Sequence, residues 1–590
     1  MIRLPFESVL RRVGAAADAL GVRAYAVGGA VRDALLGRET VDLDVVAVDP
    51  EGEGQVGIRL AEAVAKAFGA KAPAVYATFG TAAVTLRVPS SGFSVPSSDP
   101  DALADAPGEP DAPADRTRQR DENHPEPGTR NSEPTTRLVI EFVGARKESY
   151  RRDSRKPVVE DGTLADDLAR RDFTVNALAV CLNADRYGEV EDPHGGLQDL
   201  DAGLLRTPLD PRVTFEDDPL RMLRAARFAA QLGFRIEAET LEAIRQSAER
   251  IEIVSQERIT DEIGKMLASP LPSLGFSVLH ETGLLDLVLP ELAALAGVEA
   301  VGGVKHKDNL YHTLEVVDNL ALAQAEAGRT GVRAEGYDLW LRWAALFHDI
   351  AKPETKRFAP GTGWTFHGHE DRGARKNIPA LFRRLKLPLG EPLSYVRDMV
   401  RLHHRPTALV DEDVTDSAVR RLLFEAGDDV EDLMMLVRAD VTSKNEKRKR
   451  RYLRGFDRVE AKMREVEEKD RMRNWEPPVS GDEIKQRLDL PEGIAVGILK
   501  EWVREAVLEG DVPNEHDPAF AWVEKQREEA VYRAGLFHHM VRLLKGPEKR
   551  AMGAIKDAVF WDDLPLDDEA AALAYLQEVK DDALDDDTDA

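Results

Sequence analysis

The secondary-structure pattern changes once along this chain, and the change decides which folds it can adopt. Strand-like and helical runs alternate from residue 22 to residue 88, and the segment LVIEFVGA resumes the strand pattern around Glu141. From Leu164 onward, nearly every segment has the periodicity of a helix. We therefore expect an α+β fold, in which a small head with a mixed sheet at residues 1–163 precedes an all-helical body.

Composition marks further boundaries. The head contains an insert at about residues 90–137 that is rich in Pro, Asp, Ser and Thr. Such a segment cannot bury a core, so we expect it to be disordered. We interpret the helical body as a neck at 164–270, a histidine-rich domain at 271–443 and a C-terminal region at 444–580. The end of the chain, 581–590, predicts an acidic disordered tail.

Charge, cysteine content and hydropathy limit the class of protein. A net charge of −27 is unusual for a protein that binds nucleic acid, because phosphates attract a positive field. A single cysteine, Cys181, excludes internal disulfides, and the chain has neither a signal-peptide pattern nor a long apolar run. We therefore expect a cytoplasmic protein that contacts no membrane, and nothing in the sequence indicates an obligate protein partner.

A glycine turn followed by two aspartates is the first candidate site. Gly28 and Gly29 join a strand to a helix, where glycines let the backbone approach a ligand and free N–H groups suit a triphosphate. In the following strand, VDLDVVAV, Asp42 and Asp44 are two residues apart and therefore point to one face. Such carboxylates suit Mg²⁺ that bridges to phosphates, and Glu141 is the natural third carboxylate. Two surface aspartates on an exposed sheet face are the alternative interpretation.

Three later motifs give the glycine turn and the aspartates a family context. They are RRDFTVNA at 170–177, DDPLRMLR at 217–224, and QERI at 256–259 with Glu262. Together the motifs resemble class II tRNA nucleotidyltransferases and bacterial poly(A) polymerases of the polymerase-β-like superfamily. The resemblance extends from about Ala24 to Leu267 apart from the insert. It implies a polymerase-β-like nucleotidyltransferase head and a neck that reads the base and binds RNA.

The resemblance also implies a reaction and a set of contacts. An RNA 3′-OH would attack the α-phosphate of CTP or ATP, with two Mg²⁺ ions held by Asp42 and Asp44 and with Glu141 as the third carboxylate. The implied activity is addition of CCA to the 3′ acceptor end of tRNA without a nucleic-acid template. The residues that would bind the nucleotide are Gly28, Gly29, Arg32, Arg171, Asp172, Asn176, Asp218, Arg221 and Arg224.

Asp218 and Arg221 are the candidates for reading the base. Their spacing predicts one helix face, on which a carboxylate can accept from an exocyclic amine while a guanidinium donates to the base. This pair could select cytosine and adenine over guanine and uracil. An ion pair within the helix is the alternative interpretation. The family usually has Glu before this aspartate, whereas this chain has Asp217.

A second constellation of histidines and aspartates follows in the helical body. The candidates are His312, His348, Asp349, His369, His403, His404 and Asp440. Their order resembles the HD phosphohydrolase superfamily, in which an adjacent His-Asp pair ligates a divalent metal. The resemblance implies one site in which His312 and Asp440 join the His-Asp pair, and His369 and His403 could add a second. The sequence does not choose between His403 and His404.

The ligand types indicate which metal the histidine-rich domain would hold. Imidazole and carboxylate together suit a transition metal such as Ni²⁺ or Mn²⁺ better than Mg²⁺ alone. The resemblance implies that such a metal activates water to hydrolyse a phosphomonoester or a 2′,3′-cyclic phosphate at an RNA end. A structural relic without activity is the alternative.

Basic side chains are concentrated at the start of the C-terminal region. The run KNEKRKRR contains the candidate RNA-binding residues Lys447, Arg448, Arg450 and Arg451. On an acidic protein this run is the clearest phosphate-binding patch, and it could contact the acceptor or elbow of tRNA. A solvated helix face is the alternative interpretation.

The leading functional hypothesis is a CCA-adding enzyme with an appended phosphohydrolase. Poly(A) polymerases share the head motifs, but the Asp218–Arg221 pair favours CCA addition because both C and A must be read. The polar segment from Gly144 to Asp166 matches the family's flexible loop, which is expected in enzymes that add the terminal A. A chain that is mainly an HD phosphohydrolase is disfavoured by Asp42 and Asp44. A non-catalytic RNA-binding protein would need neither constellation.

Overall fold

The computed structural model describes most of the chain. The described residues are 4–38, 42–49, 55–76, 80–89, 135–151, 154–301, 304–305, 308–329, 337–411, 415–470, 472–473 and 475–585. They form two compact units, Met1–Ala294 and Leu295–Ala590. Within these described ranges, no helix is long and apolar enough to cross a membrane.

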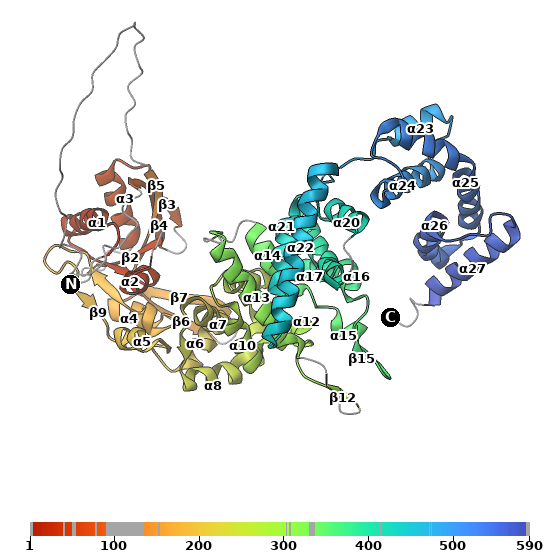
Figure 1. Ribbon diagram of the computed structural model, residues 1–590. Helices are drawn as coiled ribbons and strands as arrows, with labels where there is room; N and C mark the ends of the chain where they lie inside the picture. The colour runs from red at the N-terminus through yellow and green to blue at the C-terminus, as the bar shows by residue number, and fades with distance from the viewer. Residues whose placement is uncertain are drawn as a thin grey trace, which may run out of the picture. The chain divides into compact units, whose positions relative to one another are not determined.

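The mixed sheet that the sequence predicted forms the head of the first unit and has seven strands (Figure 1), but two of them, at Ala179–Cys181 and Val190–Glu191, lie beyond the boundary expected at 163 in a segment expected to be helical. Its strand order is β3-β4-β5-β2-β1-β8-β9, in which β2 and β5 run parallel and the other neighbours antiparallel. Helices α1 (Glu7–Leu20) and α3 (Val56–Phe68) cover one face and pack on Leu43, Val45 and Ile140. The strands are β1 (Arg23–Val27), β2 (Asp42–Val48), β3 (Ala74–Tyr76), β4 (Thr81–Pro89), β5 (Thr135–Gly144), β8 (Ala179–Cys181) and β9 (Val190–Glu191).

Shorter elements complete the head: α2 packs in the same core as α1 and α3, and Leu168 of α4 packs against the other face of the sheet. Thr163 and Asp166 form a capping box that starts α4, just after the β6–β7 hairpin. The segment expected to be a polar loop therefore contains a paired hairpin. These elements are α2 (Gly29–Leu35), β6 (Arg146–Arg151), β7 (Ser154–Asp161), α4 (Leu164–Ala169), the 3₁₀ turn η3 (Thr174–Asn176) and α5 (Gly196–Ala202).

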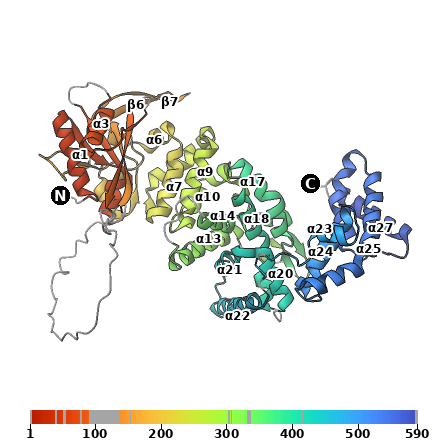
Figure 2. The same ribbon diagram turned by 90° about the horizontal axis from the view of Figure 1, so that it is seen from above.

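The rest of the first unit is helical apart from one short strand pair. Helices α7, α9 and α10 lie side by side (Figure 2). A Cβ at Gly275 of α10 would lie 2.9 Å from the carbonyl oxygen of Ala226 on α7, so only glycine permits this approach. Because of this packing the first unit ends at Ala294, beyond the neck boundary expected at 270. The elements are β10 (Leu204–Leu205), α6 (Pro211–Asp217), α7 (Leu220–Leu232), β11 (Arg235–Ile236), α8 (Ala238–Ser247), η4 (Ala248–Ile253), α9 (Gln256–Leu267), α10 (Pro272–Glu281), α11 (Leu284–Val288) and α12 (Pro290–Ala293).

The second unit begins with the histidine-rich helices. Helices α13, α14, α18 and α21 pack on one another, and the long helix α22 packs on α19 and α20. Two small hairpins are its strands within the described residues: β12 (Ala300–Val301) with β13 (Val304–Lys305), and β14 (Arg357–Ala359) with β15 (Gly363–Thr365). The helices are α13 (Asn309–Glu326), α14 (Tyr337–Phe347), α15 (Lys352–Thr355), α16 (His369–Arg372), η5 (Gly373–Asn377), α17 (Ile378–Arg384), α18 (Glu391–Leu402), α19 (Arg405–Asp411), α20 (Asp416–Ala426), η6 (Gly427–Asp429), α21 (Val430–Ala439) and α22 (Glu446–Asp470).

The C-terminal helices share a separate core. Phe520, Phe537 and Ile555 are buried in it together with apolar side chains from the other helices of this region. Its elements are α23 (Gly481–Arg487), α24 (Ile494–Glu509), α25 (His516–Leu543), η7 (Gly546–Ala551), α26 (Met552–Trp561) and α27 (Glu569–Asp585). The predicted helical C-terminal region is therefore present.

Two predicted disordered segments meet the described residues at their edges. Helix α27 continues through Asp585, so the first part of the tail expected at 581–590 is helical. Its last turn is stabilised because Gln577 donates to Asp581 at 3.0 Å and Lys580 lies 3.4 Å from the same carboxylate. The remainder of the tail and residues 90–134 of the expected insert lie outside the described residues.

Candidate active site

Two of the three predicted catalytic carboxylates lie side by side on the sheet. Asp44 on β2 is the register partner of Glu141 on the parallel strand β5. Their neighbours Leu43 and Ile140 point into the core, so both carboxylates occupy the opposite face. Asp42 opens β2 opposite Val139, but its side chain lies outside the described residues. The sheet therefore brings together hard oxygen donors of the type that Mg²⁺ prefers.

The nine residues predicted to bind nucleotide all line one cavity of about 550 Å³, and Asp44 lines it with them. The glycine turn, the segment after α4 and the start of α7 meet at this cavity. Glu141 lines a different groove of the sheet face, together with Arg87 and Arg137. The carboxylate pair therefore lies where the cavity and this groove approach each other across β2 and β5.

Gly28 has a backbone that other residues rarely adopt. Its φ is +74° and its ψ is −137°, and a Cβ there would lie 2.8 Å from Nη1 of Arg171 and 3.6 Å from Oδ2 of Asp44. The glycine thus permits close approach of a guanidinium and a carboxylate at the wall of the cavity. Arg171 also pairs with Asp167 at 3.2 Å.

Substitution of Gly28 by Ala is expected to raise the KM for the incoming nucleotide about tenfold and to lower the melting temperature. Forcing a Cβ into this backbone region costs about 1–3 kcal/mol, and the methyl group must displace Arg171. Steady-state kinetics and calorimetry measure the two effects. Gly37→Ala is the matched control, since Gly37 has φ +66° and nothing near its absent Cβ. An equal KM effect in both variants would contradict the role of Gly28.

Asp172 organises one wall of the cavity. Arg224 on α7 donates to its carboxylate, and the amide of Asn176 donates to it at 2.9 Å. Arg32 donates to the other side of Asn176 at 2.7 Å. Burial alone would raise the pKa of Asp172, but the charge of Arg224 and these hydrogen bonds hold it well below the ordinary value. Asp172 is therefore anionic and fixes two of the cationic side chains.

The predicted base-reading pair is arranged differently from the expectation. Asp218 ends α6 in an extended conformation and precedes Pro219, so it does not share a helix with Arg221. Proline disfavours a helical conformation for the residue before it, which explains the break. Arg221 donates to the carbonyl oxygen of Arg170 at 2.6 Å, and Asp218 pairs with Arg258 at 3.3 Å. The alternative of an ion pair between Asp218 and Arg221 is therefore wrong.

Several lining residues were not predicted from the sequence. Arg227 donates to Glu262 at 2.6 Å, and its guanidinium lies 4.0 Å from the centre of the Phe228 ring. Arg227 and Gln231 follow Arg224 at intervals of three and four residues, so helical spacing along α7 could have identified them. The unpredicted lining residues include Ala30, Asp33, Arg170, Leu220, Arg227, Phe228, Gln231 and Arg258.

The second unit brings six predicted histidine and aspartate residues into one cluster. Asp349 lies between two pairs of histidines. Its Oδ2 is 3.6 Å from Nε2 of His312 and 3.3 Å from Nε2 of His348. Its Oδ1 is 3.2 Å from Nε2 of His369 and 4.0 Å from Nε2 of His403. Asp440 completes the cluster, with Oδ1 at 3.0 Å from Nε2 of His312.

The four histidines of this cluster use their other ring nitrogen to bind the surrounding structure. Nδ1 of His348, His369 and His403 each contacts a backbone carbonyl oxygen at 2.8, 2.8 and 2.6 Å. Nδ1 of His312 contacts Oγ1 of Thr442 at 2.8 Å. This pattern turns each Nε2 toward the carboxylates at the centre of the cluster and fixes each ring, as is usual for metal-binding histidines.

The centre of the cluster contains buried polar atoms without hydrogen bonds among the described residues. They are Nε2 of His348, His369 and His403 and Oδ1 of Asp349. Burial of polar atoms without partners is unfavourable, and a bound cation would satisfy all four. Burial opposes ionisation of Asp349, yet its contacts with His348, Lys352 and His369 keep its pKa well below the ordinary value. The donor set therefore fits one or two divalent transition metals.

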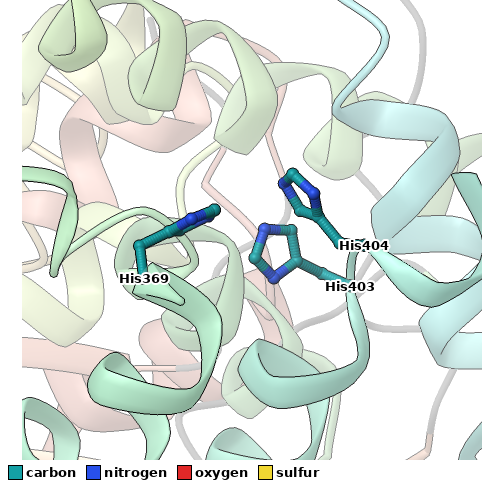
Figure 3. Close-up of side chains that lie close together, drawn as sticks. All are labelled: His369, His403 and His404. Atoms are coloured by element: carbon teal, nitrogen blue, oxygen red, sulfur yellow. The ribbon is translucent and has the colours of Figure 1, made fainter. Parts of the chain in front are cut away.

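His403 and His404 both lie near His369, as Figure 3 shows. The three rings can offer ligand atoms within 4.8 Å of one another. His403 is buried and its Nε2 is near Asp349, whereas His404 is exposed. The geometry favours His403 as the inner residue without removing His404 from the group.

The predicted RNA-binding residues are exposed in the first turns of α22. They are Lys447, Arg448, Arg450 and Arg451.

Sequence profiles of three protein families match consecutive parts of the chain. The profile described as "Poly A polymerase head domain" matches residues 97–206. The one described as "Probable RNA and SrmB- binding site of polymerase A" matches 233–295, and "HD domain" matches 309–434. The head match begins after Asp44 and the HD match ends before Asp440, so the positions of these two residues rest on the geometry.

Two relatives and one solved structure extend the comparison. The chain is 35% identical over 378 residues to the A-adding tRNA nucleotidyltransferase of Deinococcus radiodurans, covering 62% of this chain and 80% of that relative. It is 32% identical over 499 residues to the CC-adding tRNA nucleotidyltransferase of Thermus thermophilus, covering 83% and 90%. A structure of a CCA-adding enzyme (apo form II) shares the fold with a TM-score of 0.53 and 20% identity, covering 88% and 95%. By this similarity along most of its length, the chain belongs to the tRNA nucleotidyltransferase family and carries an HD domain.

Proposed function

We propose that this protein adds C and A residues from CTP and ATP to the 3′ end of tRNA and completes the CCA sequence. One observation carries this proposal: the glycine turn, Asp44 and the predicted base-reading residues line a single cavity. The A-adding and CC-adding relatives support tRNA as the acceptor. The β6–β7 hairpin occupies the position of the loop expected in enzymes that add the terminal A, which favours complete addition.

In this proposal Asp42, Asp44 and Glu141 hold Mg²⁺ at the sheet face. The adjacent register positions of Asp44 and Glu141 and their carboxylate chemistry fit that ion. When bound, the metal would stabilise negative charge on the attacking and leaving oxygens. Arg32 and Arg171 neutralise the triphosphate from the cavity wall, and the N–H groups after Gly28 donate to its oxygens. Asp172 keeps Arg224 and Asn176 oriented toward the sugar and base.

Asp218 and Arg221 recognise the base in this proposal. The Asp218 carboxylate accepts a hydrogen bond from the exocyclic amine of cytosine or adenine, and Arg221 donates to an acceptor atom of the ring. Arg258 positions Asp218 through their 3.3 Å contact. Guanine and uracil present a carbonyl where cytosine and adenine present the amine, so Asp218 rejects them.

Asp218→Ala is expected to lower kcat/KM for CTP and ATP about 10–100-fold, because a hydrogen bond to a charged group contributes about 1.5–3 kcal/mol. UTP and GTP incorporation should fall much less, so base selectivity decreases. Single-nucleotide incorporation with each triphosphate measures this. Asp201→Ala, which removes an exposed carboxylate on α5, serves as the control. Unchanged selectivity in the Asp218 variant would remove this residue from base recognition.

The decisive test of the main proposal is nucleotide addition to tRNA transcripts that lack the 3′ CCA, with Mg²⁺. CTP, ATP, GTP and UTP are tested separately and together. Addition of two C residues and one A, followed by arrest, is expected. Addition of C alone or of A alone would restrict the enzyme to part of the sequence. Long A tails would indicate a poly(A) polymerase, and no addition would contradict the proposal.

The histidine–aspartate cluster supports a second function, hydrolysis of a phosphate or 2′,3′-cyclic phosphate at an RNA 3′ end. His312, His348, Asp349 and Asp440 would hold Ni²⁺ or Mn²⁺, and His369 and His403 would serve a second ion. Such a metal, when bound, would activate water for attack on phosphorus. Full-length protein supplied with Ni²⁺ or Mn²⁺ is expected to hydrolyse 2′,3′-cyclic AMP, and failure to do so would contradict this function.

The exposed basic residues of α22 are proposed to contact RNA phosphates. They are Lys447, Arg448, Arg450 and Arg451.

A further inference from the structure

A cavity of about 550 Å³ lies beside the histidine–aspartate cluster. His312 and Asp440 contribute to its lining, and so do Lys444, Arg448 and Tyr452 from the segment that leads into α22 and from the helix itself. Its volume falls within the range of about 300–1,000 Å³ that is usual for small-molecule sites. The cluster and the start of the basic run therefore face a common space, although they are separate features in the sequence.

The cluster is open on the side of this cavity. The side chain of Asp440 is 24% exposed and that of His312 is 10% exposed, whereas His348, Asp349 and His403 are each 1% exposed. The two more exposed members are the ones that line the cavity. A substrate in this space would therefore reach the cluster through His312 and Asp440.

The chemistry of the cavity suits a nucleoside phosphate. Within the described part of the chain, Lys444 and Arg448 form no ion pair, so their charges are available to a phosphate. The guanidinium of Arg448 lies 5.7 Å from the centre of the Tyr452 ring. Glu315 also lines the cavity, and its negative charge disfavours a phosphate nearby. A phosphate would therefore bind on the side of the cavity that carries Lys444 and Arg448. Cations combined with an aromatic face are characteristic of sites for single-stranded nucleic acid.

We propose that this cavity binds the last two nucleotides of a single-stranded RNA whose 3′ end is processed at the cluster. Lys444 and Arg448 contact the phosphodiester before the terminal nucleotide, and Tyr452 stacks on a base. The inference rests on the proposed hydrolase function of the cluster. A free 2′,3′-cyclic mononucleotide has the same terminal group but lacks that phosphodiester, so the cavity selects RNA ends over mononucleotides.

The combined variant Lys444→Ala/Arg448→Ala separates these two sources of cyclic phosphate. With full-length protein and Ni²⁺ or Mn²⁺, kcat/KM for a trinucleotide ending in a 2′,3′-cyclic phosphate is expected to fall about tenfold or more, since two phosphate contacts are lost. The value for 2′,3′-cyclic AMP is expected to change less than about twofold, since that substrate has no such phosphodiester. Equal loss on both substrates, or no loss on the trinucleotide, would overturn the inference.

Arg454→Ala/Arg458→Ala is the matched control. It removes the same charge from exposed positions of α22 that do not line the cavity. Hydrolysis of both substrates by this variant should equal that of the unaltered protein. A loss equal to that of the Lys444 and Arg448 variant would assign the effect to the general charge of α22 and overturn the inference.

Binding is measured independently of hydrolysis, so that failure of the hydrolase function can be distinguished. A trinucleotide that carries 4-thiouridine at its last position and a 3′-phosphate is photo-crosslinked to the full chain, and the modified peptides are identified by mass spectrometry. Crosslinks are expected in the segment from Lys444 to Tyr452, with loss in the Lys444 and Arg448 variant and retention in the control. No crosslink to that segment in the unaltered protein would overturn the inference even if hydrolysis occurs.

Discussion

Replacing Asp44 by Asn is expected to lower the rate of nucleotide addition about 10²–10³-fold or more, since a charged group that stabilises the transition state is lost. Asparagine keeps the size of the side chain but removes the negative charge beside Glu141 that attracts a divalent cation. Single-turnover extension of a labelled tRNA that lacks its terminal A measures the chemical step. Because Asp44 is only half-buried, the change should leave the melting temperature nearly unaltered.

Asp185→Asn provides the control for this prediction. Asp185 forms an exposed ion pair with Arg23 at 2.7 Å, so its loss removes one negative charge from the head without touching the cavity. Exposed pairs of this kind add little to stability, so folding and activity should both be retained. Normal addition rates in the Asp44 variant would place the catalytic metal elsewhere.

Replacing Asp349 by Asn is expected to abolish transition-metal binding at the HD domain and the hydrolysis that depends on it. Both oxygens of Asp349 face histidine nitrogens, and an amide offers one weaker donor in their place. Loss of a residue that only hydrogen-bonds to a metal ligand lowers metal affinity about 10–100-fold. Loss of a ligand itself should therefore lower the affinity at least as much. Metal content after loading with Ni²⁺ and removal of excess is measured by mass spectrometry.

Two further measurements keep the Asp349 prediction specific. Nucleotide addition by the same variant should be unchanged, because the cavity of the head belongs to the other compact unit. His369→Gln tests the cluster without breaking the contact between Asp349 and Lys352 at 2.6 Å. Full Ni²⁺ retention by both variants would contradict the assignment of this cluster as a metal site.

The sequence predicted the mixed sheet and the residues of the nucleotide cavity better than it predicted their local conformation. Alternation of apolar residues predicted the strands before residue 145 but missed β8 and β9, which are too short to show it, and the four motifs were sufficient to group residues from Gly28 to Arg224. The prediction of one helix containing both Asp218 and Arg221 was wrong, because Pro219 disfavours a helical conformation for the residue before it. A local steric rule therefore outweighed the helical spacing.

Contacts between distant segments could not be predicted from spacing. Arg32 and Asn176 are 144 residues apart in the chain, and their hydrogen bond depends on the path of every strand between them. In the HD domain the order of histidines indicated the cluster, but the Nδ1 contacts follow from turn geometry at the helix ends. That Arg448 and Asp440 line the same cavity likewise depends on how α22 packs on its neighbours.

The shared location of the residues that we propose to contact the base constrains how this enzyme can diverge. Arg221 and Arg224 lie in the single helix α7, and Asp218 ends α6 two residues before it, so in our proposal adjacent segments present all three side chains to every incoming nucleotide. If these residues contact both bases as we propose, a mutation there would alter the handling of C and A together. Specialisation into separate C-adding and A-adding enzymes is therefore more accessible through substitutions outside α7, such as in the β6–β7 hairpin.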